Sequence, residues 1–365
     1  MGHKNLLALA AARALFVCLS VAPQFVAAQA KTAKPLDVAF VYVSPVSDTG
    51  WTAQHDAGRK QLQANLGTAV TTSFVDKVAE GADAERVIRD LAVQGKQLIF
   101  TTSFCFMDPT LKVAKEFPKT TFVHVSGYKT APNVANVNAR FYESRYVAGW
   151  LAGKYSKSGT AGYVAAFPIP EVLQGVNAFT LGMQSANPKA QVKLVWTNSW
   201  FDPGRETEAA NTLIAQGADV LTHHTDSNAV PLAAEAKKIK VLSYHSDMQS
   251  SAPNAQLAAT THQWGVYYTQ TAKQVIAGTW KTGSLWGGAK EGMIRVEGFG
   301  KAVSKADQAA VLSKLKAIAD GKLHPFTGKI TDNAGKVHQD KGVMSDAALS
   351  DMNYLVARVV GSVPK

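Results

Sequence analysis

Residues 37–66, DVAFVYVSPVSDTGWTAQHDAGRKQLQANL, decide how this chain folds. They begin with an apolar run at 38–43 that predicts a buried strand. A loop carrying Asp48 and Trp51 follows, and it opens directly into a helix. In an open parallel sheet, ligands bind just beyond the carboxyl ends of the strands, where such loops lie. The large flat face of Trp51 at this position indicates that something flat rests on it.

The same order of strand, loop and helix repeats along the chain. Short continuous apolar runs between helices are typical of parallel strands buried on both faces. Further strands of the first series are predicted at 70–75, 98–101 and 121–125, with helices at 83–94 and 110–116. A helix over 140–155 leads to a crossing at 156–159, and a second series follows. Its strands are predicted at 162–166, 192–197, 220–223, 241–244 and 257–261, and its helices at 172–186, 206–216, 228–238 and 267–277.

Two similar series joined by crossings predict an α/β protein with two lobes and a cleft between them. A chain of 365 residues exceeds a single core, which favours the same division. We expect lobe 1 at 36–143, with a return segment at about 265–305, and lobe 2 at 144–264. Residues 306–365 contain one predicted helix and a Gly-punctuated hairpin, which we expect to pack on the lobes.

The first thirty residues have the pattern of a secretory leader. Lys4 and Arg13 accompany a short apolar core, and residues 28–30 have the small-x-small form of a signal-peptidase site. The apolar run is too short to cross a bilayer, and no later segment approaches the length of a spanning helix. We therefore expect cleavage near residue 30 and export to the periplasm. A lipid anchor at Cys18 is not expected, because Val17 before it is not small.

Composition narrows the class of protein. The net charge is +11, but the basic residues are dispersed and do not interleave with aromatic residues, so we expect no nucleic-acid partner. A hydrophobic content of 46% with 18% charged residues is typical of globular proteins. With the leader removed, Cys105 is the remaining cysteine, so we expect no intrachain disulfide.

Aromatic and acidic side chains recur just past the predicted strands of both lobes. Aromatic faces stabilise a stacked base by about 1–3 kcal/mol each, and a carboxylate accepts hydrogen bonds from ring N–H or amino groups. The sequence therefore predicts a site for a flat, nitrogen-rich ligand that draws the two lobes together. The predicted ligand-binding residues are Asp48, Trp51 and Phe104 in lobe 1, and Phe167, Glu171, Trp200, Asp226, Asp247 and Trp264 in lobe 2.

Catalytic and metal signatures are sparse. Neighbouring His223 and His224, with His245 and His262 later in the chain, suggest zinc, yet adjacent residues on a strand point to opposite faces. The chain has no P-loop, GxSxG, HExxH or CxxC motif. We therefore expect binding without catalysis, metal or cofactor. A nucleoside hydrolase or deaminase, and a sensory receptor for another small molecule, remain as alternatives. Asp202 before Pro203 has a simpler role, as the cap of the following helix.

Several motifs together resemble the basic membrane protein family, the substrate-binding proteins of ABC importers that include purine-nucleoside receptors. The resemblance implies a type I periplasmic-binding fold, with two Rossmann-like lobes of parallel strands joined by a three-strand hinge. It also implies a monomeric receptor that passes its ligand to ABC permease subunits at the inner membrane. The motifs, within residues 37–299, are DTGWTAQHDAGRK, VAEGADAERVI, LIFTTSF, MDPT, FPIPEVLQGVNAF, TNSWFDPGRETEAA and THHTDSNAVPLAAEAK.

The resemblance also assigns residues by motif. The two aromatic residues that stack on the base in this family fall on Trp51 and Trp200. The first-loop aspartate of the family falls on Asp48, and its small-Phe pair falls on Ser103 and Phe104.

Two segments depart from the nucleoside receptors of that family. Residues 244–248 read YHSDM where those receptors have VDSDQ, and residues 261–265 read THQWG where they have VKRVD. The lost aspartate and lysine lie near the ribose in the family, so their loss weakens sugar recognition. The resemblance therefore favours a free purine base such as adenine, with a nucleoside as the alternative ligand.

Overall fold

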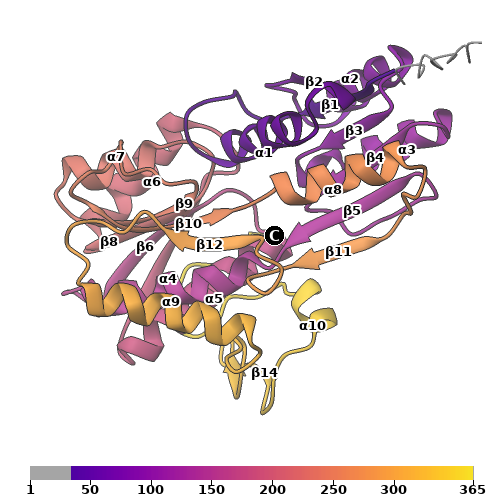
Figure 1. The fold of residues 1–365 in the computed structure, drawn as a ribbon. Helices are drawn as coiled ribbons and strands as arrows, with labels where there is room; N and C mark the ends of the chain where they lie inside the picture. The colour runs from indigo at the N-terminus through magenta and orange to yellow at the C-terminus, as the bar shows by residue number, and fades with distance from the viewer. Residues whose placement is uncertain (1–33, 365) are drawn as a thin grey trace, which may run out of the picture. The chain divides into compact units, whose positions relative to one another are not determined.

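Two sheets organise residues 34–364, the part of the chain that the computed structural model describes (Figure 1). In the first sheet the strands lie in the order β11-β5-β4-β3-β1-β2, and every neighbouring pair is parallel. These strands are β1 Leu36–Val41, β2 Val70–Val75, β3 Leu98–Thr101, β4 Thr121–Val125, β5 Val134–Ala139 and β11 Ser284–Gly287.

The second sheet has the order β12-β10-β9-β8-β6-β7-β15. Its neighbours are parallel except β12, which pairs antiparallel with β10. The strands are β6 Thr160–Ala165, β7 Gln191–Trp196, β8 Val220–His224, β9 Lys240–His245, β10 Gln256–His262, β12 Ile294–Glu297 and β15 Val359–Val360.

Helices connect the parallel strands and bury their apolar residues. The helix α2 shows why: its predicted stripe of Ala84, Val87, Ile88, Leu91 and Ala92 is buried, which confirms the 3.6-residue periodicity read from the sequence. The helices are α1 Trp51–Leu66, α2 Ala82–Val93, α3 Met107–Glu116, α4 Phe141–Tyr155, α5 Pro170–Ala186, α6 Pro203–Ala215, α7 Ala229–Ala236, α8 Gly265–Ile276, α9 Lys305–Ala319 and α10 Asp346–Ser350.

The core strands of both sheets share one topology. In the first sheet the order is β2-β1-β3-β4-β5, and in the second it is β7-β6-β8-β9-β10. In each sheet, successive strands are added first on one side of the starting strand and then on the other. This change of side occurs between β1 and β3 in the first sheet and between β6 and β8 in the second. Ligands of open α/β sheets bind at such switch points, beyond the carboxyl ends of the strands.

Three segments join the two lobes, at residues 139–141, 262–265 and 287–294, since each leads from a strand of one sheet to an element of the other lobe. The helix α8 follows the second of these and packs on α1, where the amide of Asn65 donates to the Thr269 hydroxyl at 3.1 Å. The C-terminal segment lies against lobe 2: β15 extends its sheet beside β7, and the Tyr155 hydroxyl donates to Asp307 of α9 at 2.9 Å. A two-stranded hairpin, β13 Ile330–Thr331 and β14 Val337–Gln339, follows α9.

Some predictions at the level of elements were wrong. Trp51 is the first residue of α1 rather than a loop residue, and β1 ends at Val41, two residues earlier than predicted. The strands β5, β11 and β12 were missed. In β5 two asparagines, Asn136 and Asn138, interrupt the apolar run, while β11 and β12 are short and partly exposed. The predicted cap is confirmed, because the Asp202 carboxylate accepts the Arg205 N–H at 3.0 Å at the start of α6.

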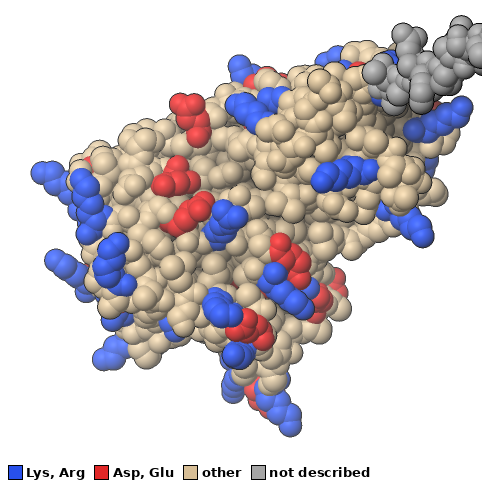
Figure 2. Space-filling view, in the orientation of Figure 1, with Lys and Arg blue, Asp and Glu red and all other residues tan. Residues whose placement is uncertain are grey.

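Within residues 34–364, no helix has both the length and the apolar character needed to cross a membrane. On the face drawn in Figure 2, Lys and Arg side chains are spread out, with Asp and Glu among them. The predicted leader and Cys18 lie outside the described residues.

Candidate functional site

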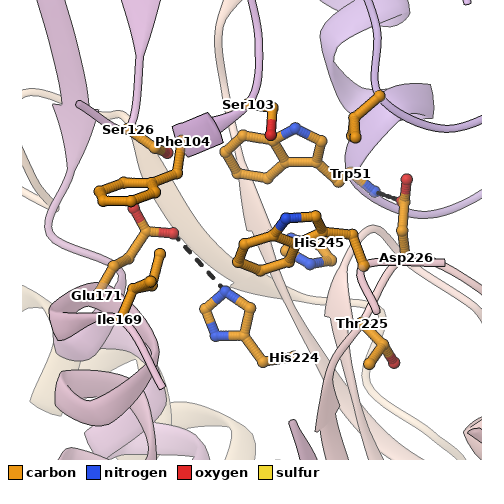
Figure 3. A pocket seen from close by; sticks show the side chains of 12 residues that line it. Trp51, Ser103, Phe104, Ser126, Ile169, Glu171, His224, Thr225, Asp226 and His245 are labelled. Atoms are coloured by element: carbon orange, nitrogen blue, oxygen red, sulfur yellow. Dashed lines mark hydrogen bonds and ion pairs between the residues drawn. The ribbon is translucent and has the colours of Figure 1, made fainter. Parts of the chain in front are cut away.

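A cavity lies at the switch points of the two sheets, where loops from both lobes meet. About 390 Å³ of space, part of it open to solvent, lies among the lining atoms, and the walls combine aromatic, aliphatic and polar side chains (Figure 3). Each lining segment ends or follows a strand. The lining residues are Val43, Trp51, Ser103, Phe104 and Ser126 from lobe 1, and Ile169, Glu171, Trp200, His224, Thr225, Asp226 and His245 from lobe 2.

Trp51 forms a rigid part of the lobe 1 wall. Its indole N–H donates to the backbone oxygen of Thr102 at 2.7 Å, which fixes the ring relative to β3. The edges of neighbouring rings surround it, with centroids of His55 at 4.4 Å and His245 at 5.4 Å. Only 8% of Trp51 is exposed. The ring is therefore both a core residue and a wall of the cavity.

Trp200 faces the cavity from lobe 2. Its indole N–H donates to the Glu80 carboxylate of lobe 1 at 2.9 Å, so this residue also links the lobes. The Phe167 ring supports it at a centroid distance of 5.0 Å. No ring contact between Trp51 and Trp200 occurs among the aromatic pairs of residues 34–364, although both line the same cavity.

Glu171 and His224 form the polar end of the cavity. Glu171 lies in the first turn of α5, and its carboxylate oxygen is 3.7 Å from Nε2 of His224, as the dashed line in Figure 3 shows. Burial raises the pKa of Glu171 to about 7 and lowers the pKa of His224 well below its usual value. Within the described residues, Oε2 of Glu171 and Nδ1 of His224 have no hydrogen-bond partner. Buried polar atoms without partners are rare in folded proteins, which makes these two candidates for ligand contacts.

Asp226 joins the lobes directly beside the cavity. Its carboxylate accepts the backbone N–H groups of Trp51 and Thr52 at the N-terminus of α1, and the hydroxyl of Ser44. Burial raises the pKa of Asp226 well above its usual value, and the N–H groups of Trp51 and Thr52 oppose that shift. Gly50 makes this approach possible: its φ is +98°, and a Cβ there would overlap the backbone and carboxylate oxygens of Asp226.

His245 ends β9 in an unusual backbone conformation. Its φ of +71° lies in the left-handed region, which few residues other than glycine adopt. Its Nδ1 is 2.9 Å from Nε2 of His262, and Nδ1 of His262 accepts the indole N–H of Trp264 at 2.9 Å. Backbone strain of this kind is concentrated at functional sites.

The comparison with known proteins identifies the family. A model of PnrA-like ABC transporter substrate-binding proteins matches residues 36–324. The chain belongs to this family. Its members bind substrates for ABC transporters, and the two lobes of parallel sheets are the type I periplasmic-binding fold.

Individual relatives of this PnrA-like protein carry more specific names. A purine-binding protein of Brucella abortus (strain 2308) is 47% identical over 350 residues, covering 96% of this chain and 100% of the relative. A Haloferax volcanii protein, provisionally named an ABC transporter glucose-binding protein, is 33% identical and covers 90% of this chain and 81% of its own. A solved solute-binding protein of an Aeropyrum pernix K1 ABC transporter superposes with a TM-score of 0.68. It is 18% identical and covers 83% of this chain and 95% of its own, so it supports the fold alone.

The structure gathers some of the predicted site residues of this PnrA-like protein and separates others. Trp51, Phe104, Glu171, Trp200 and Asp226 line the one cavity.

The other four predicted residues lie outside that lining. Asp48 is exposed in the loop before α1, and Asp247 is exposed, with its carboxylate accepting the Gln256 amide at 2.7 Å. Phe167 contacts Trp200 from behind, and Trp264 is buried behind His262 with 1% exposure.

Several lining residues were not among the residues predicted to bind ligand. Ser126 and Ile169 follow strands, and His224 and His245 are the last residues of β8 and β9, so the topological rule applied to them equally. The predicted set of binding residues contains only aromatic and acidic side chains from those loops, so the histidines are absent from it. In residues 34–364 no group of three His, Cys, Asp or Glu side chains is arranged to hold a metal ion.

Proposed function

We propose that this PnrA-like protein captures a purine in the cavity between its lobes and delivers it to an ABC permease. One observation supports this most: Trp51 and Trp200 reach the same cavity from opposite lobes. Two indole faces on one cavity suit a flat aromatic ligand, because each stacked face contributes about 1–3 kcal/mol. Glu171, His224 and His245 supply the polar atoms that a nitrogen-rich ring requires at its edge. The name of the Brucella abortus relative agrees with this ligand class.

A free base such as adenine fits the cavity better than a nucleoside. A ribose presents vicinal hydroxyls, which are best bound by groups that both donate and accept hydrogen bonds. Of the hydroxyl and carboxyl groups in the lining, Thr225 donates to Glu206, and Asp226 accepts from Ser44 and the first N–H groups of α1. Ser103, Ser126 and Glu171 are therefore the ones left for a ribose. The positions at which the nucleoside receptors carry an aspartate and a lysine are His245 and His262 here.

The setting of this function follows from the sequence pattern. The leader-like segment at 1–30 supports export to the periplasm with cleavage near residue 30, without a lipid at Cys18. The protein then acts as a monomer without cofactor or nucleic-acid partner, and it binds its ligand without transforming it. Its protein partners are the permease subunits at the inner membrane.

Titration calorimetry tests the ligand class. Adenine, guanine, adenosine, guanosine and glucose are titrated into the purified protein under one set of conditions. We expect adenine to bind with micromolar or tighter affinity, and adenosine more weakly than adenine. Tight binding of glucose with no binding of any purine would overturn the proposal and would favour the ligand named for the Haloferax volcanii relative. Incubation with adenosine and inosine, followed by chromatography, tests the alternative of a hydrolase or deaminase through the appearance of product.

A further inference from the structure

His245 is held in one tautomer by two residues behind the cavity. The indole nitrogen of Trp264 is a donor only, so Nδ1 of His262, which receives its hydrogen bond, carries no proton. Both imidazoles are neutral: burial lowers the pKa of His262 to about 3 and lowers the pKa of His245 well below its usual value. A neutral imidazole with an unprotonated Nδ1 carries its proton on Nε2.

The tautomer of His262 in turn fixes the tautomer of His245. The protonated Nε2 of His262 donates to Nδ1 of His245, 2.9 Å away. Nδ1 of His245 is then the acceptor, and its proton lies on Nε2. That nitrogen has no hydrogen-bond partner within residues 34–364, and its ring is one of the walls of the cavity, labelled beside Trp51 and His224 in Figure 3. The left-handed backbone of His245, φ +71°, turns the end of β9 at this residue.

We propose that His245 is the specificity-determining donor of the cavity: through Trp264 and His262 its Nε2–H is fixed to recognise a ring nitrogen or carbonyl oxygen of the bound base. This inference rests on the proposed purine-binding function and adds a selection rule to it. A ligand with an acceptor at this point gains a hydrogen bond. A ligand with N–H or C–H at the same point leaves the buried donor of His245 unpaired, which weakens its binding by about 10- to 100-fold.

Deaza analogues of adenine test the rule one atom at a time. The compounds 1-deaza-, 3-deaza- and 7-deazaadenine each replace one ring acceptor by C–H, and each is titrated calorimetrically into the full-length protein. We expect at least one analogue to bind about 10- to 100-fold more weakly than adenine. In a His245→Asn variant that loss disappears, because adenine itself now binds as weakly as the analogue. Asparagine is chosen because it tolerates a positive φ and its side chain is shorter than that of histidine.

A substitution of Trp264 tests whether the hydrogen bonds from Trp264 through His262 fix the tautomer of His245. The Trp264 side chain lies behind the cavity, so the substitution leaves the cavity walls in place. Trp264→Phe removes the N–H that fixes His262, so both tautomers of His245 become accessible and the discrimination against that analogue shrinks. Trp280→Phe is the matched control: Trp280 packs on the same lobe 1 core, and its indole makes no hydrogen bond among those described for residues 34–364. It should keep the wild-type ratio of affinities.

Nitrogen-15 NMR of the histidine rings gives a readout that does not depend on the stability of any variant. We expect the proton of wild-type His245 on Nε2, and a mixture of tautomers in Trp264→Phe. A proton on Nδ1 of His245 in the wild type would overturn the inference. The same holds if every analogue binds more weakly than adenine and the difference in affinity persists in His245→Asn. If adenine binds and all three analogues bind equally well, only the role of His245 fails. If no purine binds the wild type, the proposed function itself fails.

Discussion

Trp200 uses the two parts of its side chain for different purposes. The N–H edge reaches Glu80 in the other lobe, and the rest of the ring lines the cavity against Phe167. The indole N–H of Trp51, in contrast, donates to a backbone oxygen of its own lobe, and its ring is surrounded by other rings. Trp200 is the more exposed of the two, so its substitution separates stacking from core stability more cleanly.

The contribution of stacking is therefore measured at Trp200. Trp200→Ala removes the face and should weaken adenine binding by about 5- to 150-fold, the equivalent of 1–3 kcal/mol. Trp200→Phe keeps a flat face but loses the hydrogen bond to Glu80. That hydrogen bond is partly exposed to solvent and contributes about 1 kcal/mol. Calorimetry on both variants distinguishes the two effects. Equal losses in Ala and Phe would mean that the contact with Glu80, and not the face, supports binding.

Glu171 gives the ligand-free protein a dependence of stability on pH. Its pKa is about 7 in the folded protein, above the value of 4.5 for an exposed glutamate. The unfolded chain therefore releases this proton at a lower pH than the folded protein does. The free energy of unfolding contributed by Glu171 is fully present below pH 4.5 and falls as the pH rises toward 7.

Glu171→Gln removes that dependence, because the amide does not titrate. Relative to wild type, the variant should gain up to about 3 kcal/mol in free energy of unfolding between pH 4 and pH 8. Urea unfolding of the two ligand-free proteins at several pH values measures the difference. A difference that stays constant across this range would show that the pKa of Glu171 is the same in the folded and the unfolded protein.

At the scale of elements, the N-terminus of α1 is one of the places where the two lobes touch. The helix begins at Trp51, and its first N–H groups are satisfied by Asp226, which belongs to the loop after β8 in the other lobe. Side-chain capping of this kind usually comes from within the same segment. The helix is therefore fully capped only while the lobes are together, which couples its terminus to the closed arrangement.

Gly50→Ala tests this coupling. The added Cβ overlaps Asp226, so we expect it to hold the lobes apart and to weaken adenine binding by more than tenfold. Gly67→Ala is a matched control at the other end of α1, where φ is also positive, +53°, and a Cβ would meet no atom within 4 Å. Both glycines have a positive φ that other residues rarely adopt, so both variants carry about 1–3 kcal/mol of backbone strain. Calorimetric affinities that fall equally in both would attribute the effect to backbone strain rather than to closure.

The elements also show where sequence patterns are sufficient. The strands β2, β3 and β4 could be predicted to the residue, because they are short apolar or β-branched runs bounded by turns. The strand β5 could not, because Asn136 and Asn138 break its apolar run, yet the neighbours β4 and β11 complete its ladder. Pairing over long distances in the sequence supplies what the local pattern lacks.

At the scale of the whole molecule, the shared topology of the sheets brings the site together. The rule that loops follow strands at a switch point was sufficient to place Trp51 and Glu171 near one another. It could not separate His245, which lines the cavity, from Asp247 two residues later, which is exposed and bonded to Gln256 outside the cavity. The backbone of His245 is left-handed at this point, φ +71°, and the residue types around it do not predict that conformation.

In the proposed complex, a planar purine lies between Trp51 and Trp200 and holds the lobes closed. A crystal structure of the protein grown with adenine shows whether it does. We expect one adenine in this cavity, with its ring parallel to both indoles and its edge within hydrogen-bonding distance of Nε2 of His245. Adenine bound elsewhere, or bound here with either indole edge-on to the ring, would contradict it.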